Sequence, residues 1–123
     1  MGYYMDQRET KFKFKNGTDK EILSAIKNVV NEGKVSSWVD KNVVNKSTTF
    51  EDAIGECRWE YYKIDETLWF EGEKLGDDYN LFCAVAPFVE DGSYIEMSGE
   101  DGCLWRWVFE NGKCKEIYPT ITW

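Results

Sequence analysis

The dipeptide Asn111-Gly112 restricts the fold of this chain more than any other short stretch. It lies between two segments of alternating apolar and polar residues, and both of its residues tolerate the positive φ of a type I′ hairpin turn. A two-residue turn here sets the strand register, so that Phe109 opposes Cys114 and Trp107 opposes Glu116. One face of this predicted hairpin then carries Cys103, Trp105, Trp107, Phe109, Cys114 and Tyr118, and the other carries Leu104, Arg106, Val108 and Ile117.

A second hairpin is predicted upstream, where segments 58–64 and 67–73 flank Asp65-Glu66. If Lys63 opposes Leu68, one face holds Trp59, Tyr61, Leu68 and Phe70, and the other holds Tyr62, Ile64 and Trp69. A strand that is apolar on both faces is usually central in a sheet, or its second face is a contact surface. The sequence leaves both interpretations open.

Two helices are predicted before this hairpin. Thr18 and Glu21 have the spacing of a capping box, and the apolar periodicity that follows predicts a helix over 19–31. Thr48 and Glu51 repeat that spacing in front of a shorter apolar stripe, which indicates a helix of about two turns.

The remaining elements are weaker in pattern. Residues 11–15 alternate Lys and Phe and predict a half-buried strand, whereas 34–47 are predicted to be a connection. Asp77 is the expected N-cap of a third helix, which Pro87 should kink or end because proline lacks the N–H donor. Residues 93–98 predict a strand with Ile95 and Met97 on one face.

This order of elements predicts a single α+β domain over residues 1–123. The succession βαββαβ is typical of the ferredoxin-like, or split βαβ, arrangement. In that arrangement helices cover one face of an antiparallel sheet. The last hairpin would be an addition to that core. A more open α+β meander is the alternative.

The charge of the chain is concentrated in its middle. The formal net charge is −8, and residues 47–101 alone carry three Lys or Arg against fifteen Asp or Glu, which is −12. Nucleic acids bind through Lys and Arg, so this segment argues against direct nucleic-acid contact and favours a partner with a basic surface. An acidic surface that only maintains solubility is the other interpretation.

The residue types of common catalytic and metal sites are largely missing. The sequence has no histidine, so nucleophilic catalysis with a histidine base is excluded, and the four cysteines have neither CxxC spacing nor a histidine to complete a zinc site. We therefore expect no metal, no cofactor and no enzymatic activity. The cysteines could form two disulfides, but an N-terminus without an apolar signal-peptide core favours free, mostly buried thiols in the cytoplasm.

The stretches EGEKLGDD (71–78), APFVEDGSYIEM (86–97) and GEDGCLWRWVF (99–109) resemble small uncharacterised proteins of Gram-positive bacteria and of their phages and mobile elements. The resemblance spans residues 58–116 and implies no catalytic residue. In size and charge the chain is also similar to phage anti-defence proteins, such as anti-CRISPR inhibitors. That likeness implies a short acidic protein that binds a host protein.

The sequence therefore predicts a non-enzymatic binding or inhibitor protein that engages a basic surface of a host protein. The expected contact residues are Glu71, Glu73, Asp77, Asp78, Glu100 and Asp101, with Trp105 and Trp107 as apolar anchors. Those tryptophans could instead fill the core or stack on nucleic acid. The rival functions are a small-molecule binder or modest enzyme with an aromatic pocket, and a module that self-associates as a homodimer. No apolar run is long enough to predict a membrane span.

Overall fold

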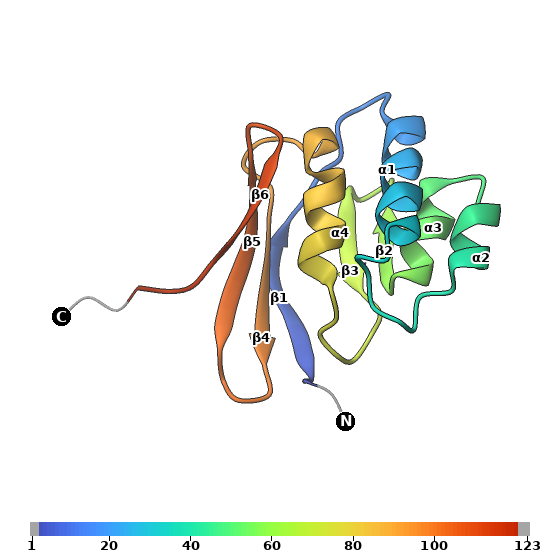
Figure 1. The fold of residues 1–123 in the computed structure, drawn as a ribbon. Coiled ribbons are helices and arrows are strands. Elements are labelled where there is room, and N and C mark those ends of the chain that lie inside the picture. The colour runs from blue at the N-terminus through green and yellow to red at the C-terminus, as the bar shows by residue number, and fades with distance from the viewer. Residues whose placement is uncertain (1–2, 121–123) are drawn as a thin grey trace.

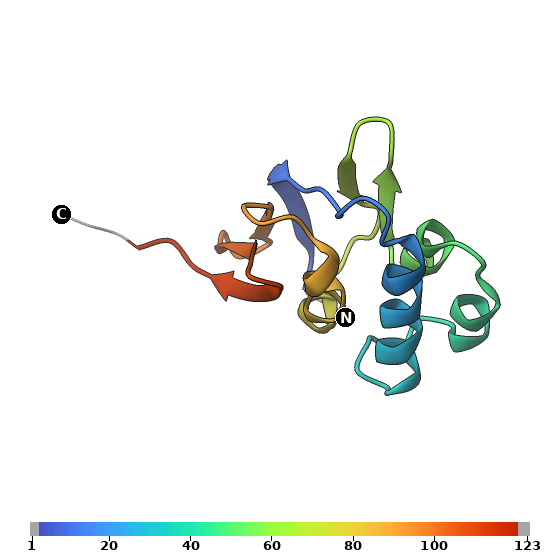
Figure 2. The same ribbon diagram turned by 90° about the horizontal axis from the view of Figure 1, so that it is seen from above.

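A computed structural model describes residues 3–120, and it is an α+β fold. A four-stranded antiparallel sheet forms one layer, and the helices together with a separate two-stranded sheet lie on one of its sides (Figure 1). The view from above shows the same division, with the small hairpin projecting from the body (Figure 2). The other face of the four-stranded sheet is uncovered by any element of the described chain.

The strands are β1 (Met5–Lys11), β2 (Trp59–Tyr62), β3 (Thr67–Phe70), β4 (Tyr94–Gly99), β5 (Leu104–Glu110) and β6 (Lys113–Ile117). The helices are α1 (Asp19–Asn31), α2 (Lys41–Lys46), α3 (Phe50–Glu56) and α4 (Asp78–Val85), which continues as a single 3-10 turn over Ala86–Phe88. No helix within residues 3–120 is both long and apolar enough to cross a membrane.

The C-terminal hairpin has the predicted register. Phe109 pairs with Cys114 and Trp107 with Glu116. The turn residues Asn111 and Gly112 have φ of 54° and 74°, as a type I′ turn requires. Because strand residues alternate between faces, Trp107 and Phe109 share one face of β5, and in the structure this face is buried.

The ferredoxin-like core is not confirmed. A split βαβ arrangement places all its strands in one sheet, whereas the large sheet here has the order β1-β4-β5-β6 and the hairpin β2-β3 is a sheet of its own. The coarser prediction, an antiparallel sheet with helices on one side, is confirmed. Strand order depends on contacts between distant segments, which the succession of elements does not specify.

The two sheets are joined by one side chain. Gln7 lies in β1, beside an irregularity in the β1–β4 pairing, and its amide reaches the edge of β3. Its Nε2 donates to the Leu68 carbonyl at 2.8 Å, and its Oε1 accepts from the Phe70 N–H at 2.7 Å. Gln7 thus satisfies the two backbone groups that a neighbouring strand would otherwise satisfy.

Two predictions about element boundaries and one about strand pairing were wrong. The first strand covers Met5–Lys11 rather than 11–15, although Phe12 and Phe14 are buried as their pattern indicated. The connection 34–47 contains α2, where Asp40 accepts a hydrogen bond from Asn42 N–H at 2.9 Å. The β2–β3 pairing places Tyr61, not Lys63, opposite Leu68, and this two-residue shift leaves each side chain on its predicted face.

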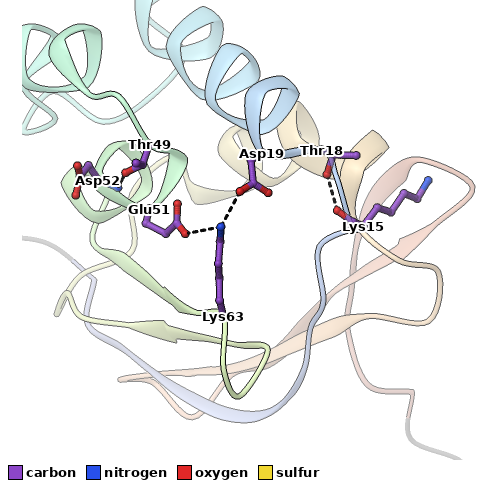
Figure 3. Close-up of polar contacts among 7 residues, drawn as sticks. All are labelled: Lys15, Thr18, Asp19, Thr49, Glu51, Asp52 and Lys63. Carbon is purple, nitrogen blue, oxygen red and sulfur yellow. Dashed lines mark hydrogen bonds and ion pairs between the residues drawn. The ribbon is translucent and has the colours of Figure 1, made fainter.

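The capping boxes were also wrong in detail. The Thr18 hydroxyl makes no cap bond to α1 and donates instead to the Lys15 carbonyl at 2.7 Å (Figure 3). The cap of α3 is Thr49, whose hydroxyl accepts from the Asp52 N–H at 3.2 Å, and not Thr48. The spacing of Thr18 and Glu21 therefore located the residue that precedes α1, whereas the spacing of Thr48 and Glu51 missed the cap of α3 by one residue.

Aromatic rings occupy the space between the two sheets and α4. Trp59, Phe82 and Trp107 are each 0 % exposed, and their ring centroids lie 5.0 to 6.1 Å apart in angled contacts. Such edge-to-face and tilted pairs are the favoured geometries of aromatic side chains. The helix α4 carries Phe82 into this cluster, so α4 lies between the four-stranded sheet and the small hairpin.

Candidate functional site

The two tryptophans predicted as contact anchors are core residues. Trp107 is 0 % exposed and its indole Nε1 donates to Glu116 Oε1 at 2.9 Å, while Trp105 is 5 % exposed. Both point from β5 toward the helices because they share the inner face with Phe109. This corrects their assignment as anchors, because Trp107 has no exposed surface and Trp105 contributes only a small part of its surface to a depression beside it.

Asp78 is likewise not a surface carboxylate. It is 8 % exposed at the start of α4, where Oδ1 accepts from Trp59 Nε1 at 2.8 Å and Oδ2 accepts from Gly76 N–H at 2.9 Å. Burial raises the pKa of Asp78 from its ordinary value, although these hydrogen bonds oppose the shift. Its function in the fold is to satisfy two buried donors.

Two more of the predicted carboxylates attach the N-terminal segment. Glu100 Oε1 accepts from the Tyr4 N–H at 3.1 Å, and Asp101 Oδ1 accepts from the Tyr3 hydroxyl. The hydrogen bond from Tyr3 lowers the pKa of Asp101. The Met5 N–H bonds the Glu73 carbonyl at 3.0 Å, so Glu73 and Glu100 flank the same strand from opposite sides. These residues form an acidic end of the molecule, but two of them already have structural partners.

The most exposed large hydrophobic residue among those that the structure describes, Ile64, lies elsewhere, at the tip of the β2–β3 hairpin, and two exposed aromatic residues share its side of the hairpin. Ile64 is 98 % exposed, Trp69 48 % and Tyr62 39 %. Carboxylates surround them on the same hairpin. We call this surface the hairpin face, and it comprises Glu60, Tyr62, Ile64, Asp65, Trp69 and Glu71. Glu71 is the predicted site residue that belongs to it.

The hairpin face is shallow. A depression of about 350 Å³ is lined by Tyr62, Asp65, Trp69, Phe70 and Glu71. Glu60 lies directly opposite Trp69 in the strand pairing, so a carboxylate and an indole are neighbours on one surface. None of Glu60, Asp65 and Glu71 is in an ion pair with another residue of the described chain. Their charge is available to a partner.

Lys63 fixes the hairpin to the helical layer. Its Nζ lies 2.6 Å from Asp19 Oδ2 and 3.2 Å from Glu51 Oε2, at the first turns of α1 and α3 (Figure 3). The ammonium also lies 5.5 Å from the centroid of the Phe50 ring. Hydrogen bonds to the two carboxylates raise the pKa of Lys63, so it remains charged. On the other side of the tip, Lys13 lies 3.3 Å from Glu66.

The residue directly before each strand of the hairpin has an uncommon backbone conformation. Arg58 has φ of 70° and Glu66 has φ of 51°, in the left-handed region that costs a non-glycine residue about 1 kcal/mol or more. The Cζ atom of the Arg58 guanidinium lies 5.1 Å from the centroid of the Trp38 ring. The backbone carbonyl of Arg58 accepts a hydrogen bond from the Glu71 N–H at 2.8 Å. The surrounding structure therefore holds the hairpin in one orientation despite this cost.

The other acidic and cysteine side chains bear on the predictions about metal sites and thiols. Within residues 3–120, no group of three or more acidic, cysteine or histidine side chains could hold a metal ion. In that same segment Cys57 and Cys114 are buried thiols and Cys83 and Cys103 are exposed ones. The free-thiol prediction is consistent with this, but half of the cysteines are exposed, not buried.

The sequence contained the signal for the hairpin face. Tyr62, Ile64 and Trp69 share a face by alternation alone, and a second apolar face on a hairpin indicates either a central strand or a contact surface. Selecting between these required the sheet order, in which the hairpin has no strand or helix over its outer side. The chain matches no family model, no curated protein and no solved structure.

Proposed function

We propose that this protein is a non-enzymatic binding protein whose hairpin face contacts a basic surface on a partner protein. One observation carries the proposal: Ile64 is 98 % exposed at the tip of a hairpin that Lys63 holds in place through Asp19 and Glu51. An exposed isoleucine on a fixed support costs little conformational entropy when a partner covers it.

The chemistry of the hairpin face determines the kind of partner. Trp69 and Tyr62 offer large rigid surfaces of the type that dominates binding energy at protein interfaces. The unpaired carboxylates of Glu60, Asp65 and Glu71 favour Lys and Arg on the other side, and they repel nucleic-acid phosphates. The partner surface is therefore basic with an apolar centre.

A host protein inhibited by this contact is the biological setting that we propose. The sequence resembles small proteins of Gram-positive bacteria and their phages, and its size and charge are similar to those of anti-defence inhibitors. An inhibitor of that type acts by occupying a surface, so it requires no catalytic group. Glu73 and Asp77, exposed beyond Glu71 in the same loop, extend the negative field on that side.

The two rival functions have less support. A small-molecule pocket shared by Trp69 and Trp105 does not form, because the two residues line different depressions. Self-association through the hairpin face would bring the carboxylates of two copies together, and like charges across an interface are unfavourable. A basic partner avoids that repulsion.

The test is affinity capture from a host lysate with matched variants. We expect W69A/E71K to lose at least about tenfold in partner affinity, since a truncated hot spot costs about 1.4 kcal/mol or more. The control is I117A/E110K, which makes the same two kinds of change at an exposed isoleucine and an exposed glutamate of the C-terminal hairpin. Raising the salt concentration should weaken wild-type binding, because exposed charges are screened.

The comparison between the two variants decides the outcome. Loss of the captured protein with W69A/E71K and its retention with I117A/E110K would support the hairpin face. Equal retention by both variants, with both folded as judged by their denaturation midpoints, would exclude the hairpin face as the contact site.

A further inference from the structure

The face of α4 that covers β6 carries a cysteine opposite another cysteine. Cys83 lies in α4 and Cys114 lies in β6, and the two elements run side by side in both views of the fold (Figures 1 and 2). Cys114 is 7 % exposed and points toward the helical layer, since it shares the inner face with Phe109 and Trp107. The two thiols therefore occupy facing sides of one packing interface.

Two contacts locate Cys83 along that interface. The Tyr79 hydroxyl, one helical turn before Cys83, donates to the Cys114 carbonyl at 3.2 Å. Pro87, one turn after Cys83, lies against the β5–β6 turn, where a Cβ on Gly112 would be 3.6 Å from the Pro87 Cα. Residues four apart in a helix share one face, so Cys83 lies between these contacts and over residues 112–114.

The titration behaviour of the same groups agrees with this placement. Burial, with a contribution from the neighbouring Cys83 thiol, raises the pKa of the Cys114 thiol. Hydrogen bonding to the Cys83 thiol raises the pKa of Tyr79. The two other cysteines have different surroundings: Cys57 is buried, and Cys103 hydrogen-bonds the exposed Asp101.

We propose that Cys83 and Cys114 are a redox pair that forms an intrachain disulfide between α4 and β6 when the protein meets an oxidant of the glutathione disulfide class. Cys83 is exposed and is the attacking thiol, and Cys114 is the resolving thiol. The inference does not depend on the proposed partner contact, because both cysteines lie outside the hairpin face.

The reaction is a pair of thiol–disulfide exchanges. The Cys83 thiolate attacks one sulfur of glutathione disulfide, which forms a mixed disulfide and releases one glutathione thiolate. Cys114 then loses its proton and attacks Cys83 Sγ, which releases the second glutathione. The two protein thiols give up two protons and two electrons, and one glutathione disulfide becomes two glutathione molecules. Because Cys114 has a raised pKa, the second step is faster at mildly alkaline pH.

The closed disulfide would stabilise the fold. It would link positions 83 and 114, and a cross-link over a long loop removes conformations mainly from the unfolded chain. We expect the denaturation midpoint of the oxidised protein to rise, and to return to its original value when a reductant is added.

The experiment compares the full chain with three single variants in a glutathione redox buffer. We expect the wild type and the control C103S to lose the mass of two hydrogen atoms and to give a proteolytic fragment in which positions 83 and 114 are joined. C83S and C114S should give no such fragment, and C114S should stop at the glutathione adduct of Cys83. C83S changes an exposed residue, so it remains a test if C114S fails to fold.

Three results would overturn the proposal. They are a wild-type protein that keeps all its thiols, a wild-type protein that stops at the glutathione adduct even at mildly alkaline pH, and a disulfide that involves Cys57 or Cys103 in place of Cys83 and Cys114.

Discussion

Asp78 is a buried carboxylate that accepts a hydrogen bond from Trp59, although its neighbours in the sequence are exposed to solvent. It follows the exposed Asp77 and lies in an acidic loop, yet it is buried and accepts from Trp59 Nε1. Burial raises its pKa above the ordinary value of 3.8. In the window between 3.8 and the raised pKa, the folded protein holds a proton that the unfolded chain has released, so this group lowers stability as pH rises through that window.

Replacing Asp78 with Asn should remove this pH dependence. An asparagine keeps an acceptor for Trp59 Nε1 but cannot ionise, so the unfolding free energy of wild type relative to D78N should fall as the pH rises above 3.8 and through the raised pKa. Urea denaturation followed by tryptophan fluorescence at several pH values measures the difference. The neighbouring D77N is the control, because it neutralises an exposed carboxylate in the same loop and leaves the bond between Asp78 and Trp59 in place. A constant difference between wild type and D78N across this range would mean that Asp78 is not the group responsible.

The tryptophans show what strand alternation leaves undecided. Alternation separates Trp105 and Trp107 from Leu104 and Arg106, but it does not say which of the two faces is buried. Trp69 resembles Trp107 as a strand tryptophan, yet it is 48 % exposed and Trp107 is fully buried. Which face of β5 is buried depends on the packing of α4 on one side of the sheet.

Among the elements, the β5–β6 hairpin is the one most fully specified by its own residues. Its turn requires left-handed backbone at both positions, and Gly112 has φ of 74° there. Nothing from another element is needed to set this register, and the observed pairing is the predicted one.

We expect G112A to destabilise the protein by about 1 kcal/mol, since an L-residue in left-handed backbone carries about that strain. The space around a Cβ at this position is adequate, because the nearest atom would be the Pro87 Cα at 3.6 Å. The matched control is G55A in α3, where a Cβ meets nothing within 4 Å and alanine should stabilise the helix by about 0.5–1 kcal/mol. A midpoint that falls for G112A and rises for G55A, each relative to wild type, would confirm both predictions. A decrease of similar size in both variants would show that general packing, and not the φ of Gly112, determines the stability change.

At the scale of the whole molecule, the two sheets and the helical layer depend on a few cross-links. Gln7 joins β1 to β3, and Lys63 joins the hairpin to α1 and α3. The hydrogen bonds of Gln7 are partly buried, whereas Lys63 and its partners are substantially exposed. Gln7 should therefore matter more for stability, because an exposed ion pair contributes little in water.

Replacing Gln7 with Met should cost about 1–3 kcal/mol, because the shape is kept while Phe70 N–H and Leu68 C=O lose their partners. The control T10V removes only the acceptor that Gln7 Nε2 uses at 2.7 Å and leaves both bonds to β3, so its cost should be smaller. Chemical denaturation gives both values. Equal effects of Q7M and T10V would show that the link between the sheets does not depend on the β3 bonds.

The sequence by itself determined the features that depend on neighbours along the chain. These are the register of the β5–β6 hairpin, the span of α1, the end of α4 before Pro87 and the division of both hairpins into two faces. Turn conformation, backbone donors and side-chain alternation act within a few residues, so a short stretch contains the necessary information.

Only the tertiary structure decided which strands share a sheet and which faces are buried. The hairpin β2–β3 is a separate sheet that Gln7 links to β1 through Leu68 and Phe70, some sixty positions away, and the buried Asp78 bonds Trp59. Such contacts are selected by packing among distant segments, which leave no local pattern. For the same reason the sequence could not show that Trp105 and Trp107 are buried and that Trp69 and Ile64, on the hairpin face, are exposed.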